Sequence, residues 1–408
     1  MGYEFRETHN LRLKEEDKMK TNRLVCFGMA IAIMVLLAGA FAERTPEAAQ
    51  PEPEKKPLVI GHIVDLSKID PRMGRYCRDA ALLRVEEVNA AGGIGGRKVE
   101  YVVLNDEGDP SRTVALAQGL VARGARGILM GYNSACMAAL ADLAKENKIP
   151  IIGPVVATDS LADHPFMFLV SGANLAFIKD SLHRIQQRGF KKVALMYATT
   201  TWGIDFSKQI RVLAPEYGIE VVGMEGATEP PADLTVQARS LRNGNPNIVM
   251  LSNYTAGHAA WFRAINAIGW KVHTQAICGP LGSGIGKVID PRLAEGAEVV
   301  SHIDPRKPES KAIYDAFNKR FGDADGLQMT MYCGYEAARL LLEGARRATN
   351  PDSGASIKEG LESIRDFPIG IGTKALRASF SATDHITLEP GFMVPWRVVN
   401  GVLGVLDY

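Results

Sequence analysis

Cysteine is scarce in this sequence, with five in 408 residues, and no two of them form a CxxC pair. That number is too small for a disulfide scaffold, and the spacing argues against a structural zinc site. An excess of charge of one sign is also lacking, because 47 lysines and arginines balance 46 aspartates and glutamates to a net charge of +1. A strongly basic nucleic-acid-binding protein is therefore excluded, and we expect no nucleic acid as a partner.

Enzyme signatures are missing as well. The sequence contains no HExxH zinc motif and no GxSxG nucleophile elbow. Residues 92–96 are glycine-rich, but they follow a predicted helix and precede a strand, the reverse of a phosphate-binding turn. Residues 282–286 follow a strand, yet they lack the spaced third glycine and the downstream acid. We therefore expect no enzyme, no cofactor and no metal.

The amino terminus has the pattern of an export signal. Residues 24–42 carry no charge, follow three basic residues, and end in Ala40-Phe41-Ala42, which has the A-x-A form of a cleavage site. We expect residues 1–42 to be a signal peptide cut before Glu43, with Met19 as an alternative start, and the remainder to be periplasmic. The competing interpretation is an uncleaved membrane anchor, because the stretch is just long enough to span a bilayer.

The segment that follows is rich in proline and glutamate. Residues 43–57 contain four prolines among charged side chains and cannot bury apolar area. Such a composition predicts a disordered, extended linker between the leader and the folded body.

From residue 58 onward, buried strands alternate with amphipathic helices. The hydrophobic fraction of 46% fits a folded chain, and the length suggests two to three domains. Repeated βαβ units predict an α/β fold with two doubly wound parallel-sheet lobes. The tail is predicted to form a hairpin around Asn400-Gly401. The predicted strands cover residues 58–64, 99–104, 127–130, 149–155, 166–170, 193–197, 219–224, 248–251 and 275–278, and the helices cover 75–91, a segment opening at 109–110, 135–148, 174–187 and 311–348.

Ligands of doubly wound sheets bind outside the carboxyl ends of the strands, which identifies candidate site residues. In the first lobe these ends carry small hydroxyl and amide groups, and in the second they contribute Trp202 and Tyr254, a combination that suits a small amphiphilic ligand. The start of the 135–148 helix favours an anion such as a carboxylate. The alternative is that Ser134 and Thr158 only cap helices and that the two aromatic residues are ordinary packing. The segments are 65–67, 132–134 and 157–158 in the first lobe, and 199–202, 253–254 and 279–281 in the second.

The order and spacing of several short segments resemble the leucine/isoleucine/valine-binding protein family. These proteins are the type I periplasmic solute-binding proteins of branched-chain amino acid ABC transporters. The resemblance extends over residues 58–408, and it rests on residues 60–67, 88–94, 105–110, 149–154, 202–203, 380–385 and 399–401.

The resemblance implies a Venus-flytrap architecture in which a hinge joins two lobes that close on a ligand. It implies an N-terminal lobe of residues 58–174 plus 304–375 and a C-terminal lobe of residues 175–303 plus 376–408. By position, one carboxylate-binding segment contains Ser134, Ala135 and Cys136, and a second contains Ala157 and Thr158. The predicted ligand-binding residues are Ser67, Ser134, Ala135, Cys136, Ala157, Thr158, Trp202, Tyr254 and Leu281.

Two departures from the family pattern bear on the ligand. Leu281 occupies the position where amino-acid receptors carry a glutamate that pairs with the ligand's ammonium group. Either another acid, such as Asp65 or Asp205, replaces it, or the ligand is a carboxylate without an amine, which the sequence favours. The disulfide of some relatives has no counterpart here, which leaves Cys278 and Cys333 as a pair that could bond instead.

The resemblance implies a binding protein that captures a small carboxylate or amino acid and delivers it to an ABC transporter permease. Contact with the membrane would occur only through that permease or through the amino-terminal anchor. The alternative function is a ligand sensor that reports to a membrane signalling partner, which retention of residues 24–42 would favour. An exported α/β enzyme is a third hypothesis.

Overall fold

The computed structural model describes residues 18–19, 55–154, 161, 163–171, 174–277, 289–322, 324 and 329–407. Contacts divide the chain into two units, Met1–Glu54 and Lys55–Tyr408, and the structure below is that of the second. Within the described ranges, no helix combines the length and the apolar character needed to cross a bilayer. The stretch predicted as signal or anchor, residues 24–42, lies outside those ranges.

The first sheet has five parallel strands in the order β2-β1-β3-β4-β5. Every residue of β1 is buried, as expected for a strand with helices on both faces. Its side chains alternate between two cores: Leu58 and Ile60 pack with helices α2 and α12 (Met329–Arg347), whereas Val59 and Ile63 pack with α3, α4 and α5. The strands are β1 (Leu58–Val64), β2 (Val99–Asn105), β3 (Gly127–Met130), β4 (Ile151–Gly153) and β5 (Met167–Leu169), and the helices are α2 (Pro71–Ala90), α3 (Pro110–Ala122), α4 (Ser134–Ala138) and α5 (Ala141–Asn147).

The second sheet has seven strands in the order β14-β13-β10-β9-β8-β6-β7. Strands β6 to β10 are parallel, and the antiparallel β13 and β14 complete one edge. The strands are β6 (Lys192–Ala198), β7 (Glu220–Ala227), β8 (Ile248–Ser252), β9 (His273–Ile277), β10 (Glu298–Ser301), β13 (Val394–Val399) and β14 (Val402–Val405). Between them lie α7 (Asn174–Gln187), α8 (Thr201–Leu213), η1 (Ala214–Tyr217), α9 (Thr235–Asn243), α10 (Thr255–Ala267) and η4 (Pro291–Ala294).

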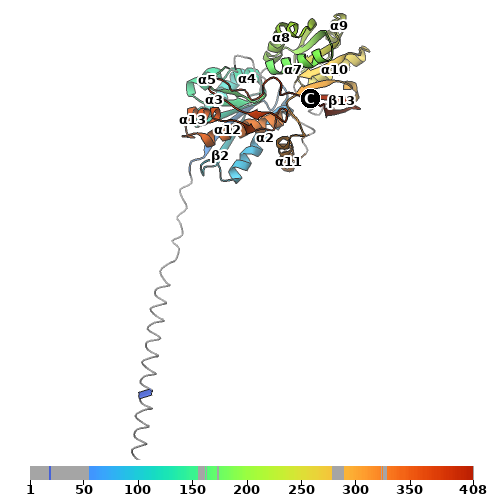
Figure 1. Ribbon diagram of the computed structural model, residues 1–408. Coiled ribbons are helices and arrows are strands. Elements are labelled where there is room, and N and C mark those ends of the chain that lie inside the picture. The colour runs from blue at the N-terminus through green and yellow to red at the C-terminus, as the bar shows by residue number, and fades with distance from the viewer. Residues whose placement is uncertain are drawn as a thin grey trace, which may run out of the picture. The chain divides into compact units, whose positions relative to one another are not determined.

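The chain returns to the first lobe after β10. Helices α11 (Pro308–Phe321), α12 (Met329–Arg347) and α13 (Gly354–Glu362) follow. Helix α12 packs along α2 (Figure 1) and also contacts β3 and β4. A short antiparallel pair, β11 (Phe367–Pro368) and β12 (Arg377–Ala378), precedes the last passage to β13. The fold is the predicted α/β architecture of two parallel-sheet lobes; the exact lobe bounds stay a prediction.

Two predicted helices are each divided in the structure. The helix expected over residues 135–148 consists of α4 and α5, and the Leu140 amide between them donates to the Met137 carbonyl in a tighter turn. The helix expected over 311–348 consists of α11 and α12. Helix α11 ends at Gly322, whose φ of 86° lies in the left-handed region that favours glycine.

The predicted turns are confirmed, and the disulfide that the sequence left open is not formed. Gly92 and Gly93 have positive φ angles and follow the end of α2, as expected for a helix stop. Asn400 and Gly401, with φ of 54° and 73°, join β13 to β14, and their N–H groups both donate to the Glu295 carboxylate. Cys333 is a buried free thiol and does not pair with Cys278, which lies outside the described residues.

Candidate functional site

The loop after β1 is held by a buried carboxylate. Asp65 accepts hydrogen bonds from the N–H groups of Ser67, Lys68 and Ile69, at 3.0, 2.9 and 2.7 Å. Burial alone raises the pKa of Asp65, but these bonds and one from the Tyr132 hydroxyl reverse the effect and hold the pKa below its usual value. Asp65 is therefore a structural anion whose oxygens are occupied within its own lobe. Ser67 is exposed, and its hydroxyl accepts from the Asn105 amide.

Tyr132, at the end of β3, fixes this loop to the next strand end. Its hydroxyl donates to Asp65 Oδ2 at 2.9 Å and accepts from the Asp70 N–H at 2.8 Å. Asp70 then caps α2 by accepting from the Met73 N–H at 3.2 Å. The carboxyl ends of β1 and β3 therefore form one hydrogen-bonded edge of the first lobe.

The start of α4 contains three predicted carboxylate-binding residues. Asn133, not Ser134, caps this helix, and its side-chain oxygen accepts from the N–H groups of Ala135 and Cys136 at 3.0 and 3.3 Å. The Cys136 side chain is fully buried in the core of the first lobe, and burial raises the pKa of its thiol to about 12. Ser134 is also buried. Its role, and those of Ala135 and Cys136, stay predictions.

The carboxyl ends of β6 and β8 bring Trp202 and Tyr254 together as neighbours. Their ring centroids are 5.7 Å apart, and Trp202 is 6% exposed while Tyr254 is half-buried. The indole N–H of Trp202 has no hydrogen-bond partner among the described residues. The alternative acid Asp205 lies one turn further along α8, where the side chains of Asn174 and Gln209 donate to it.

Glu229, just beyond the end of β7, is a carboxylate that the sequence reasoning did not select. Its Oε1 accepts from the Asn253 amide at 3.0 Å and from the Tyr254 N–H at 3.1 Å. Burial raises the pKa of Glu229 to about 7, and the nearby Asp70 carboxylate adds to the rise, although the hydrogen bonds oppose it. Applying the strand-end rule to the edge strand β7 would have identified it.

Contacts among the described residues join the strand ends of the two lobes. The Thr255 hydroxyl, at the start of α10, donates to Asp70 Oδ2 at 3.2 Å. The rings of Tyr132 and Tyr254 meet edge to face, with centroids 6.2 Å apart. Burial raises the pKa of Asp70, although the bonds from Met73 and Thr255 oppose the rise. The structure therefore brings Tyr254 against Tyr132 of the first lobe, and Trp202 lies beside Tyr254.

Three predicted site residues, Ala157, Thr158 and Leu281, lie outside the described residues, as does the glycine-rich segment 282–286. Their roles stay predictions.

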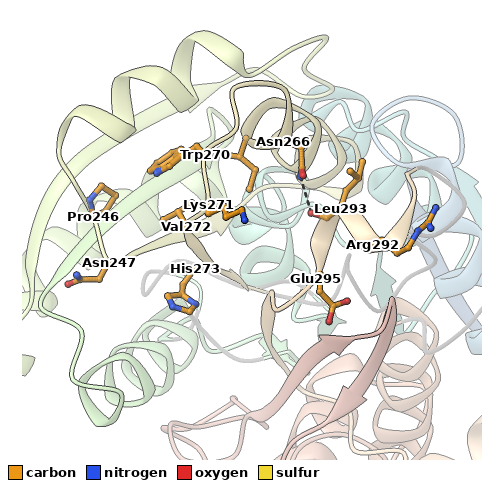
Figure 2. A pocket seen from close by; sticks show the side chains of 11 residues that line it. Pro246, Asn247, Asn266, Trp270, Lys271, Val272, His273, Arg292, Leu293 and Glu295 are labelled. Carbon is orange, nitrogen blue, oxygen red and sulfur yellow. Dashed lines mark hydrogen bonds between the residues drawn. The ribbon is translucent and has the colours of Figure 1, made fainter.

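A hollow of about 570 Å³ lies at the amino ends of strands in the second sheet, away from the carboxyl ends described above. Figure 2 shows its lining, with Asn247 and His273 at the amino ends of β8 and β9 and the Asn266 amide bonded to the Leu293 carbonyl at 3.1 Å. Because ligands of doubly wound sheets bind at the carboxyl ends of the strands, this hollow is separate from the candidate site.

Comparison with known proteins identifies the family to which this chain belongs. A family model described as "Periplasmic binding protein" matches residues 57–400. The chain belongs to the periplasmic binding protein family. Members of this family are solute-binding proteins and not enzymes. The match extends over both lobes of this periplasmic binding protein and ends just before β14.

Individual relatives are distant but cover nearly the whole chain. A leucine-, isoleucine-, valine-, threonine- and alanine-binding protein of Pseudomonas aeruginosa is 21% identical over 341 residues, which are 82% of this chain and 87% of that protein. Among solved structures, a periplasmic binding protein type 1 from Bordetella pertussis has a TM-score of 0.77 and 20% identity, covering 86% of this chain and all of that one. A branched-chain amino acid ABC transporter protein from Thermus thermophilus with bound valine has a TM-score of 0.79 and 16% identity, covering 87% and 96%. These structural similarities support the type I Venus-flytrap fold.

Proposed function

We propose that this periplasmic binding protein is exported, captures a small carboxylate between its lobes, and delivers it to an ABC transporter permease. The observation that carries the proposal is the meeting of strand ends from both lobes, through Thr255 with Asp70 and Tyr254 with Tyr132. The relative from P. aeruginosa is named for amino acids that it binds, which makes an amino acid the first ligand to examine.

The predicted carboxylate subsite lies in the first lobe, at Ser134, Ala135, Cys136, Ala157 and Thr158, with Ser67 at the neighbouring strand end. Trp202, Tyr254 and Leu281 belong to the opposing lobe. Aromatic rings on one side and small polar groups on the other match a ligand with an apolar side chain and a charged end. No ligand bond is broken in this function, and the ligand is released unchanged.

A thermal-shift screen of the purified protein against amino acids and amine-free carboxylic acids tests the proposal. A ligand at a hundred times its dissociation constant stabilises the folded state by about 2.7 kcal/mol, which produces a clear rise in melting temperature. Recovery of the unchanged ligand by chromatography separates binding from turnover. If no compound raises the melting temperature, the proposal of a carboxylate ligand is contradicted. If a bound compound is recovered chemically changed, the enzyme hypothesis is supported instead.

Export has its own test. If residues 1–42 are a cleaved signal, amino-terminal sequencing of the periplasmic protein begins at Glu43. An intact leader in a membrane fraction would favour the anchored form instead.

A further inference from the structure

No cation among the described residues pairs with the carboxylate of Glu229, whose Oε2 is buried. Its Oε1 is occupied by Asn253 and Tyr254, whereas its Oε2 is buried and has no hydrogen-bond partner among the described residues. None of the lysine, arginine or histidine side chains in the described ranges forms an ion pair with it. Burying an unpaired carboxylate costs several kcal/mol, so a site that keeps one is suited to receive a positive charge.

The neighbouring Asn253 offers a second unused acceptor. This side chain is 1% exposed, and its Oδ1 has no partner in the part of the chain that the structure describes. The nitrogen of the same amide group donates to Glu229 at 3.0 Å, so this oxygen belongs to a group that contacts the carboxylate. These two acceptors, which receive no donor among the described residues, match an ammonium group, which has three N–H donors and no acceptor.

Aromatic faces complete the surroundings. Tyr254 bonds to Glu229 through its backbone N–H and lies 5.7 Å from the Trp202 ring and 6.2 Å from Tyr132. Aromatic faces attract cations, and they also exclude water, which strengthens a charge pair beside them. Gly257 leaves the room for this arrangement, because a Cβ there would lie 2.4 Å from Glu229 Oε1.

We propose that Glu229 and Asn253 form a subsite for a protonated nitrogen of the ligand, at the ends of β7 and β8. This inference rests on the proposed function, in which a carboxylate group of the ligand binds the first lobe. It replaces the acid missing at Leu281 by one from a different strand, and it reverses the expectation that amine-free acids are the preferred ligands. The ligand class is then a zwitterion with a primary amine.

Calorimetry with matched ligands tests the subsite. The probes are leucine and valine, their amine-free acids isocaproate and isovalerate, and their carboxylate-free amines isoamylamine and isobutylamine. We expect the wild-type protein to bind the amino acids at least tenfold more tightly than the matched acids. Glu229→Gln should lose most of that discrimination, whereas Glu220→Gln, an exposed glutamate at the start of β7, should retain it.

The outcomes separate this inference from the proposed function. Equal or tighter binding of the acids by wild type overturns the subsite while leaving the carboxylate function intact, and this comparison needs no variant. Unchanged discrimination in Glu229→Gln also overturns it. Binding of the amines alone, lost in Glu229→Gln, supports the subsite and contradicts the carboxylate class. If none of these probes binds, both proposals are wrong.

Discussion

Two carboxylates at the strand ends differ in how their charge is stabilised. Asp65 receives three backbone N–H bonds and a tyrosine hydroxyl, so it is an anion that the protein stabilises by itself. Glu229 receives bonds at one oxygen only, and its other oxygen is buried without a partner among the described residues. The first therefore shapes its loop, and the second is the carboxylate with binding capacity left.

The elevated pKa of Glu229 predicts a pH-dependent stability. With a pKa of about 7, the folded-state carboxyl of Glu229 keeps its proton to higher pH than a glutamate with the ordinary pKa of 4.5. Between these values the folded state binds more protons, so this residue lowers the free energy of unfolding as pH rises. As pH rises from about 4.5 to about 8, we expect the free energy of unfolding of Glu229→Gln to increase by about 1–3 kcal/mol relative to that of wild type. Urea unfolding across that range measures it, and parallel pH profiles of the two proteins would contradict it.

Gly257→Ala tests the fit around Glu229 at the same scale. The new Cβ would meet Glu229 Oε1 at 2.4 Å and Asn253 Cβ at 2.7 Å, so one of them must move. We expect a loss of about 1–3 kcal/mol in the free energy of unfolding. The control is Gly119→Ala in α3, where a Cβ meets nothing within 4 Å and better helix propensity should raise stability. Equal effects of the two substitutions in urea unfolding would refute this steric account.

At the scale of elements, the segment that passes from β10 to α11 is held by a buried lysine. Lys307 is 3% exposed, and its ammonium donates to the carbonyls of Ile371, Thr373 and Leu376 at 3.0, 3.3 and 2.9 Å. Burial lowers the pKa of Lys307, although nearby acids oppose the change. The Lys307 side chain therefore connects the segment between β10 and α11 to the loop that precedes β12.

Removing that ammonium should be costly. Lys307→Met keeps most of the volume but leaves three buried carbonyls without their donor, and we expect a loss of about 2–4 kcal/mol in unfolding free energy. Lys319→Met, at an exposed position near the end of α11, should change it by less than about 0.5 kcal/mol. Chemical denaturation measures the free energy of unfolding of both variants. Similar values for the two would show that the three hydrogen bonds of Lys307 contribute little to stability.

The sequence predicted the positions of strands better than it predicted where helices end or which residues surround the candidate site. The run at residues 58–64, in which His62 is the one polar side chain, is β1 as observed, because a strand buried on both faces is apolar at nearly every position. Helix α11 ends where Gly322 adopts a positive φ, which periodicity alone does not reveal. Glu229 was missed because its partners Asn253 and Tyr254 come from another strand, and only the sheet order β8-β6-β7 brings them together.

At the scale of the molecule, the proposed function makes ligand capture depend on contacts that form when strand ends of the two lobes meet. The bond from Thr255 to Asp70 is such a contact, because each residue is fixed in its own lobe by the start of a helix. A contact formed on closure adds to the affinity of the closed state, since the ligand and the contact favour the same conformation. Thr255 is therefore predicted to affect ligand binding more than it affects folding.

Thr255→Val keeps the side-chain shape and removes the hydroxyl, so the dissociation constant of the ligand should rise several-fold while the melting temperature of the free protein stays nearly unchanged. In small-angle scattering, the ligand should reduce the radius of gyration of wild type, and the variant should need more ligand for the same reduction. The control is Thr235→Val, which removes a hydroxyl bonded to Asp233 within one lobe and should leave affinity as it was. Scattering that does not change with any bound ligand would contradict closure itself, whereas closure with unaltered affinity in Thr255→Val would contradict only the role of this bond.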